Sequence, residues 1–347
     1  MQALVMAAFG APLKLQQMPA PVLRPTDVLV DVTACGVGLT VVNLLATPGR
    51  VKQYPRIPGH EIAGRVSAVG SAVRHLTVGM RVTNHFYLTC GLCRHCRSGR
   101  ETLCLASPGQ VGQAIDGGYA QQVVLPERNL VPIPDGVSDV DAAVGSDAIA
   151  TPYHACVQEA KVKPGDTVLV VGAAGGVGIH MIQMARLCGA RVLAAERGDA
   201  RMAFIRSVGD YECVDVAQGP MAEQVLAATH GQGVDAVIDV VGSRSTLEQS
   251  LAALAVRGRL VIVGSSPAGV YGQDPSFMVD PQKILHRGLE IHSSRYVTLA
   301  EIGQTLNLIR DGQIKPIVTQ TVSMREVPEL HLSIRQGHTL GRVAMLN

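Results

Sequence analysis

The chain has no tryptophan, and aromatic residues make up only 3% of its 347 residues. Proteins that bind single-stranded nucleic acids use aromatic side chains as stacking platforms, so this class is disfavoured. The formal net charge is only +2, and acidic and basic residues are interspersed along the chain. Nucleic acids and anionic membranes attract clustered Lys and Arg instead. The expected partner is therefore a small molecule.

Long hydrophobic runs are also missing. No stretch reaches the ~18 apolar residues that a membrane span needs. The first residues, MQALVMAAFGAPLKL, do not combine a basic segment with an uninterrupted apolar stretch, as a signal peptide does. We therefore expect a soluble, cytoplasmic protein. Hydrophobic residues make up 47% of the sequence, which is enough for a sizeable core and more than one domain.

The pattern of strands changes along the chain. Up to about residue 150, short β-rich runs are broken by proline and glycine, which indicates an irregular, mostly antiparallel, barrel-like domain. From Lys163 onward, apolar strands alternate with helical stretches, which indicates an α/β domain with a parallel sheet covered on both faces. The last part is too short for a third domain, and we expect it to return to the first. The predicted division is 1–153, 154–292 and 293–347.

A glycine-rich turn, VLVVGAAGGVGIH, joins the first apolar strand of the second domain to a helix. Glycines here permit a tight turn and let the backbone approach a pyrophosphate at the helix N-terminus, where free N–H groups favour anions. The strand before the turn, the helix after it and the later βα units favour dinucleotide binding over a turn that serves packing alone. The expected contacts are Gly172, Gly175, Gly176, Val177 and Gly178.

The next strand ends at Glu196. A carboxylate at this place accepts hydrogen bonds from the adenosine ribose and repels the extra phosphate of NADP(H), so NAD(H) is favoured over NADP(H). The neighbouring Arg197 supports the opposite choice, because a guanidinium pairs with phosphate. A third interpretation is that both residues are solvated loop charges.

Four of the eight cysteines gather in CGLCRHCRSGRETLC, with gaps of two, two and seven residues. Because we expect a reducing compartment, metal binding is favoured over disulfides. Four thiolates wrap tetrahedrally around one zinc and leave no position for a substrate, so this zinc would be structural. An iron–sulfur cluster is the alternative. The expected ligands are Cys90, Cys93, Cys96 and Cys104.

Together these features resemble the medium-chain dehydrogenase/reductase superfamily, specifically its zinc-containing alcohol dehydrogenase branch. The resemblance covers essentially the whole chain, from the β-rich start through PGHE (58–61), the cysteine lobe and the GGVG turn to the closing GRV. It implies a GroES-like β-rich catalytic domain, formed by both chain ends, around an inserted, doubly wound Rossmann domain with a parallel sheet. It also implies an active site between the domains and a homodimer or homotetramer.

The family's catalytic zinc is held by a cysteine of a G-V-C-x-[ST]-D loop, by the histidine of GHE and by a third residue before the first Rossmann helix. Here the loop reads GVGLTV, so the resemblance places Gly38 at the cysteine and Val41 at the aspartate that orients the histidine. His60 and Asp147 match the other two ligands. Glycine has no ligand atom, and Cys35 lies too far along the strand for a Zn–S bond of about 2.3 Å. We therefore expect no catalytic zinc.

Without zinc, hydrogen bonds must stabilise the developing oxyanion. The resemblance makes Thr40 the expected hydrogen-bond donor. Asn43 is expected to bond the Thr40 hydroxyl and the nicotinamide ribose. His60 is the expected proton source, and with Asp147 it forms a polar surface that faces the nicotinamide. Alternatively, His60 is a core histidine and Asp147 is a helix N-cap. The resemblance also places the aromatic residue Phe86 in the substrate pocket. It assigns the nicotinamide contacts to Val263, Gly264 and Ser265, and a pyrophosphate contact to Arg342, which pairs with Glu61.

The expected function is that of an NAD(P)(H)-dependent oxidoreductase that transfers hydride to or from an activated carbonyl or a conjugated C=C, without catalytic zinc. Conjugation matters because it spreads charge onto an oxygen that a hydrogen bond can stabilise. One alternative is an alcohol dehydrogenase with an unusual metal shell that includes His60 and Asp147. The other is a nucleotide-binding protein without catalysis.

Overall fold

The computed structural model describes residues 1–265 and 274–347. The chain divides into two compact units, which are Met1–Ala150 with Tyr296–Asn347, and Thr151–Arg295. Both chain ends therefore belong to the first unit, and the second unit is inserted between them. Each break lies three residues from the boundary expected from the sequence.

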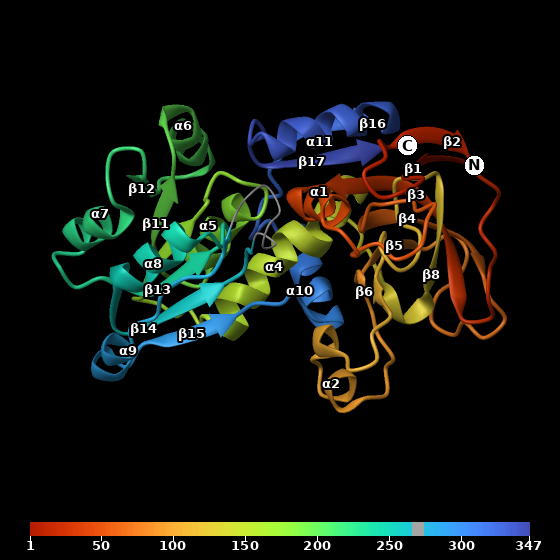
Figure 1. Cartoon of the computed structure of the whole chain (residues 1–347). Helices are drawn as coiled ribbons and strands as arrows, with labels where there is room; N and C mark the ends of the chain where they lie inside the picture. Colours follow the sequence, from red (N-terminus) through yellow and green to blue (C-terminus); the bar gives the residue numbers. More distant parts are fainter. Residues whose placement is uncertain (266–273) are drawn as a thin grey trace. The chain divides into compact units, whose positions relative to one another are not determined.

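The first unit is built on a seven-stranded sheet that both chain ends share (Figure 1). The strand order is β16-β17-β3-β4-β5-β9, and β8 also pairs with β3. Only β16 and β17 are parallel to each other. The strands of this sheet are β3 (Asp27–Val37), β4 (Glu61–Val69), β5 (Arg81–Asn84), β8 (Gln122–Pro126), β9 (Leu130–Pro132), β16 (Val318–Ser323) and β17 (Arg342–Leu346).

Two short hairpin-like pairs and several helices complete the first unit. The pairs are β1 (Gln2–Val5) with β2 (Lys14–Gln17), and β6 (Tyr87–Leu88) with β7 (Gly109–Gln110). The helices are α1 (Leu39–Ala46), α2 (Arg94–Arg97), α3 (Asp139–Val144), α10 (Leu299–Arg310) and α11 (Val327–Arg335), with a π-helical turn, η3 (Gly145–Ile149), after α3.

The second unit has six parallel strands in the order β12-β11-β10-β13-β14-β15. The chain runs outward from β10 in one direction and from β13 in the other, which is the doubly wound arrangement. The predicted fold class is therefore confirmed. The strands are β10 (Thr167–Val171), β11 (Arg191–Glu196), β12 (Glu212–Asp215), β13 (Val234–Asp239), β14 (Leu254–Ile262) and β15 (Glu290–Ser293). The helices are α4 (Ala150–Tyr153), which starts in the first unit, η4 (His154–Glu159), α5 (Gly178–Leu187), α6 (Asp199–Val208), α7 (Met221–Ala228), α8 (Arg244–Ala253) and α9 (Pro281–Arg287).

Strands β3 and β4 bring the residues of the GVG and PGHE segments together. The β3 sequence, DVLVDVTACGV, is rich in β-branched valine, which favours a strand. It pairs antiparallel with β4, and Gly36 lies opposite Glu61. A Cβ atom at Gly36 would run into the Glu61 side chain, so glycine leaves room for that buried carboxylate. The pairing places Gly38, just after β3, beside His60, just before β4.

In residues 1–265 and 274–347 we find no helix that is both long enough and apolar enough to cross a bilayer.

A buried tyrosine–histidine pair supports the turn before His60. The Tyr119 ring packs against Gly59, where an added Cβ would contact it. The Tyr119 hydroxyl lies 3.1 Å from Nε2 of His331 in α11. Burial lowers the pKa of His331 to about 4, so the imidazole is neutral at pH 7; its tautomer decides whether Nε2 accepts from or donates to the Tyr119 hydroxyl.

We expect His331 to make folding stability depend on pH. As the pH falls, the unfolded chain protonates this histidine near pH 6.5, whereas the folded chain does so only near pH 4. The unfolded state therefore binds more protons in this window, and stability falls by about 3 kcal/mol as the pH falls through it. In urea unfolding, the free energy of unfolding of His331→Gln should fall less between pH 7 and pH 4.5 than that of the unchanged protein. Equal falls in the two proteins would contradict this role of His331.

Candidate functional site

Three buried polar side chains meet in the first unit. His60, Glu61 and Asp147 are 5%, 0% and 7% exposed. His60 Nε2 lies 3.3 Å from Asp147 Oδ2 and 3.7 Å from Glu61 Oε1. The structure thus brings together two predicted site residues, His60 and Asp147, that are 87 positions apart in the sequence. A histidine ring nitrogen beside two carboxylates is an arrangement that can hold and release a proton in general acid–base chemistry.

Asp147 does not cap a helix, so that alternative prediction is wrong. It lies inside the π-helical turn η3, which continues the helix α3 without a break. The residue that caps α3 is Ser138, whose side chain accepts a hydrogen bond from the Asp141 N–H. π-Helical turns are rare and occur often at functional sites. Here the turn directs Asp147 toward His60.

Gly38 leaves space for the guanidinium of Arg342. A Cβ atom at Gly38 would overlap Nη1, Cζ and Nη2 of Arg342. That guanidinium forms an ion pair with Glu61: Nη2 contacts Oε1, and Nε lies 3.2 Å from Oε2. Burial lowers the pKa of Arg342 to about 10, which still leaves it charged at pH 7. A cation therefore lies where the family's zinc-binding cysteine would begin.

The residues present do not complete the family's catalytic zinc site, although ligand atoms of His60, Glu61 and Asp147 lie within 4.8 Å of one another. Gly38 has no ligand atom, and the Glu61 carboxylate is already neutralised by Arg342. His60 and Asp147 alone are too few, because catalytic zinc sites use three protein ligands. Cys35 does not replace the missing thiolate: it is completely buried, and burial raises the pKa of its thiol far above the usual value. A cysteine binds zinc as the thiolate and not as the thiol.

Thr40 and Asn43 lie on α1, three positions apart and so on the same face of the helix. Thr40 is exposed and Asn43 is half-buried. The expected hydrogen bond between them is not formed: neither side chain has a partner in the part of the chain that the structure describes, and the Asn43 carbonyl accepts the Thr47 hydroxyl at 2.7 Å. Their contacts with substrate and coenzyme stay predictions.

Aromatic rings pack beside the polar cluster. Phe86, the predicted pocket residue, is buried, and its ring centroid lies 4.4 Å from that of His60. The ring of Tyr296 packs against Phe86, with 3.9 Å between the ring centroids and the two planes tilted by 34°. Sequence analysis missed Tyr296, because it lies far along the chain in a segment, SRYV, that has no motif. Its place next to Phe86 is visible only in the folded chain.

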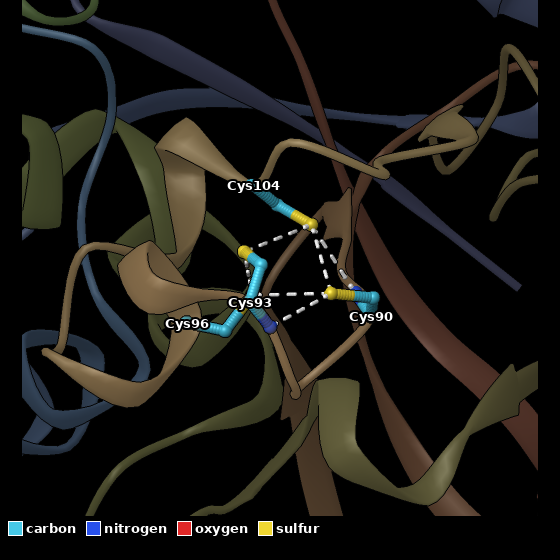
Figure 2. Close-up of side chains that lie close together, drawn as sticks. All are labelled: Cys90, Cys93, Cys96 and Cys104. Atoms are coloured by element: carbon cyan, nitrogen blue, oxygen red, sulfur yellow. Dashed lines mark hydrogen bonds between the residues drawn. The ribbon is translucent and has the colours of Figure 1, made fainter.

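The four predicted zinc ligands converge on a common centre in one lobe of the first unit (Figure 2). Their Sγ–Sγ distances are 3.5 Å (Cys90–Cys104), 3.5 Å (Cys93–Cys96), 3.9 Å (Cys90–Cys96) and 4.0 Å (Cys93–Cys104). A sulfur tetrahedron around zinc, with Zn–S of about 2.3 Å, has edges of about 3.8 Å. Backbone N–H groups of Leu92 and Cys93 also point at Cys90 Sγ, from 3.4 and 3.3 Å. The lobe fits one structural zinc.

The glycine turn of the second unit has the geometry of a phosphate cradle. Gly172 directly follows β10 and has a φ of +82°, which only glycine adopts readily. A Cβ at Gly178 would collide with the Gly172 carbonyl, so glycine lets α5 start close to the strand. The N–H groups of Gly176 and Val177 have no acceptor among the described residues. Gly175 precedes these two residues in the turn. The two free N–H groups can donate hydrogen bonds to a pyrophosphate.

Glu196 reaches across from the end of β11 to this turn. Its Oε2 accepts the Ala174 N–H at 3.1 Å, and its Oε1 accepts the Arg197 N–H at 3.0 Å. Arg201 also pairs with Oε1, at 3.2 Å. Glu196 is therefore fixed beside the turn, where a ribose is expected, rather than being a solvated loop charge. A second arginine, Arg201, was not anticipated from the sequence.

The predicted nicotinamide contacts follow β14. The N–H groups of Val263 and Gly264 donate to the Asp239 carbonyl at 2.9 and 3.1 Å. A Cβ at Gly264 would collide with the Val240 carbonyl, so this close approach needs glycine. Gly264 and Ser265 line a hollow of about 490 Å³ in the second unit.

Comparisons with known proteins agree with this architecture. The model of the alcohol dehydrogenase GroES-like domain matches residues 24–135, and that of the zinc-binding dehydrogenases matches residues 176–311. An NAD-dependent alcohol dehydrogenase of Sulfurisphaera tokodaii is 31% identical over 356 residues, with 100% of both chains covered. An acryloyl-coenzyme A reductase of the same organism is 29% identical over 347 residues, with 99% of both covered. A crystal structure of an NAD-dependent alcohol dehydrogenase has 30% identity and a TM-score of 0.90, with 100% of both chains covered.

These similarities extend over both units, and the relatives are named as dehydrogenases and reductases. The shared features include the doubly wound second unit and the β-rich first unit. The chain belongs to the zinc-containing alcohol dehydrogenase branch of the medium-chain dehydrogenase/reductase superfamily and is an NAD(P)-dependent oxidoreductase that acts on a small molecule.

Proposed function

We propose that this oxidoreductase reduces an activated carbonyl or a conjugated C=C, and that it does so without a catalytic zinc. The observation that carries this proposal is the guanidinium of Arg342 against Gly38. It fills the space of the missing ligand and holds the Glu61 carboxylate in an ion pair. With Gly38 in place of the family's cysteine, the site lacks a third protein ligand of the kind that catalytic zinc sites use.

The residues of the first unit then supply the polar chemistry. A nicotinamide coenzyme held by the glycine turn and Glu196 would supply the hydride that reduces the electrophilic carbon of the substrate. The electron pair displaced from the double bond ends on the conjugated oxygen, where the Thr40 hydroxyl donates a hydrogen bond. His60, held by Asp147, gives its Nε2 proton to the reduced substrate and is reprotonated from solvent. Plain alcohols lack this conjugation and are expected to be poorer substrates.

The names of the relatives support the substrate class and the coenzyme. An acryloyl thioester carries a C=C conjugated to a carbonyl, and one full-length relative is named as a reductase of it. Another relative is named as NAD-dependent. The Glu196 carboxylate beside the phosphate turn favours NAD(H), although Arg197 and Arg201 lie close to it. We also propose a homodimer or homotetramer, as expected from the sequence.

The test is turnover combined with metal content. The purified protein is incubated with NADH or NADPH and an enone, an aldehyde or an acryloyl thioester, and coenzyme absorbance is followed. We expect turnover, faster with NADH, and one zinc per chain. Two zincs per chain would favour the metal-dependent alternative, for which the 3.3 Å spacing of His60 Nε2 and Asp147 Oδ2 is suitable. Turnover of none of these substrates would favour a binding protein.

Replacing Thr40 by valine should lower kcat about 100-fold, because one oxyanion donor contributes on the order of 3 kcal/mol to the barrier. Coenzyme affinity should change little, since the change removes only a hydroxyl. Thr47→Val is the matched control at the C-cap of the same helix: the Thr47 hydroxyl donates to the backbone carbonyl of Asn43, so kcat should hold. Steady-state kinetics of both variants decide the matter, and full activity in Thr40→Val would remove Thr40 from the mechanism.

A further inference from the structure

Tyr296, where the chain re-enters the first unit, has an unusual backbone. Its φ is +61°, in the left-handed region, which costs a bulky residue on the order of 1 to 3 kcal/mol. The structure describes three other non-glycine residues with positive φ, and all of them are exposed, whereas Tyr296 is 6% exposed. Such a conformation persists only where the surroundings fix it, and it often marks a functional site.

The side chain of Tyr296 contacts Phe86, which packs against His60, and the backbone carbonyl of Ser146, next to Asp147. Its hydroxyl donates to the Ser146 carbonyl at 2.7 Å, in the π-helical turn immediately before Asp147. Its ring lies against Phe86, and the Phe86 ring lies against His60. Burial raises the pKa of Tyr296 well above its usual value, and the nearby Asp147 charge adds to this. The hydroxyl is therefore a constant donor to the turn.

The residues that follow Tyr296 are held on three sides. The Val297 carbonyl lies 2.9 Å from His85 Nε2. The Leu299 N–H donates to Glu101 Oε1 at 2.6 Å, and Glu101 belongs to the cysteine lobe, between Cys96 and Cys104. Thr298 caps α10 and forms a capping box with Glu301. These bonds explain how the left-handed backbone at position 296 is maintained.

We propose that Tyr296 is a positioning residue for the proton-donating pair: through the Ser146 carbonyl it fixes Asp147, and through Phe86 it fixes the His60 ring. The cysteine lobe takes part, because Glu101 anchors the segment that carries Tyr296. This inference rests on the proposed function, in which His60 supplies the proton.

Tyr296→Phe tests the hydroxyl and keeps the ring. We expect kcat for the enone or thioester to fall about tenfold, as the loss of one hydrogen bond permits. The KM for NADH and the urea midpoint of unfolding should stay near their original values. Tyr87→Phe is the matched control, since Tyr87 stacks on the same Phe86 ring at 5.0 Å, and its kcat should hold. An equal fall in both variants, or no fall in Tyr296→Phe, overturns the proposal.

A double-mutant cycle tests whether Tyr296 acts on the reaction through Asp147. If Tyr296 acts through Asp147, then Tyr296→Phe combined with Asp147→Asn should be no slower than Asp147→Asn alone. Fully additive losses would overturn the positioning role. His60→Gln separates the two proposals. A large loss in His60→Gln beside an unaffected Tyr296→Phe overturns only the role of Tyr296. Unchanged kcat in His60→Gln overturns the proton source, and with it both proposals.

Discussion

Gly38→Cys should destabilise the protein by about 3 kcal/mol and should not restore a catalytic zinc. Any Cβ at this position overlaps the guanidinium of Arg342, which would have to leave Glu61. Breaking a buried ion pair leaves a charge without compensation and costs about 3 to 5 kcal/mol. Backbone strain does not contribute, because φ of Gly38 is −146°, which any residue adopts. Urea unfolding and zinc analysis of the purified variant measure both effects.

Gly303→Ala is the matched control for this prediction. A Cβ at Gly303, inside α10, meets no other atom within 4 Å. Alanine favours a helix over glycine by up to about 1 kcal/mol, so stability should hold or rise slightly. Gly38→Ala should lose as much stability as Gly38→Cys, because overlap rather than thiol chemistry is the cause. A stable Gly38→Cys protein with two zincs per chain would contradict the account given for Arg342.

Cys93→Ser should release the zinc of the cysteine lobe and unfold the lobe locally. Structural zinc binding is worth on the order of 10 kcal/mol of folding free energy, and the helix of the lobe, α2, is only four residues long. The lobe carries exposed arginines at positions 94, 97 and 100. Trypsin should therefore cut it at least roughly tenfold faster. Activity should fall as well, because Glu101 of the lobe anchors the backbone that leads to Tyr296.

Cys188→Ser makes the same chemical change outside the lobe, at a half-buried thiol of the second unit. It should keep one zinc per chain and the original tryptic pattern. Zinc content and timed digestion followed by mass spectrometry check both variants. A Cys93→Ser protein that keeps its zinc, or that loses it without faster cleavage in the lobe, would show that the metal does not hold this region.

Features with fixed local spacing were predictable from the sequence. The four cysteines lie within 15 residues, so one lobe had to bring them together. The glycine turn with its flanking strand and helix predicted the doubly wound second unit, which is confirmed. The pairing of Glu61 with Arg342 followed from the family resemblance, and the structure forms it.

Features that depend on long-range packing were not predictable. The π-helical turn that carries Asp147 has no sequence signal, and the expectation of a helix N-cap was wrong for that reason. The left-handed Tyr296 is fixed by Glu101, His85 and Ser146, which are far from it in sequence. The absence of a cysteine at position 38 was evident from the sequence. That a guanidinium occupies the space became evident only from the pairing of β17 with β3.

The pairing of β17 with β3 also has a consequence for biosynthesis. Arg342, at the start of β17, is synthesised 281 residues after Glu61. Until Arg342 has left the ribosome, the carboxylate of Glu61 lacks this counter-ion, and burying it is costly. We therefore expect the first unit to stay open around Glu61 while the second unit, Thr151–Arg295, is already complete and can fold as a unit. Neutralisation of the Glu61 charge by β17 is then the step that closes the cluster of His60, Glu61 and Asp147.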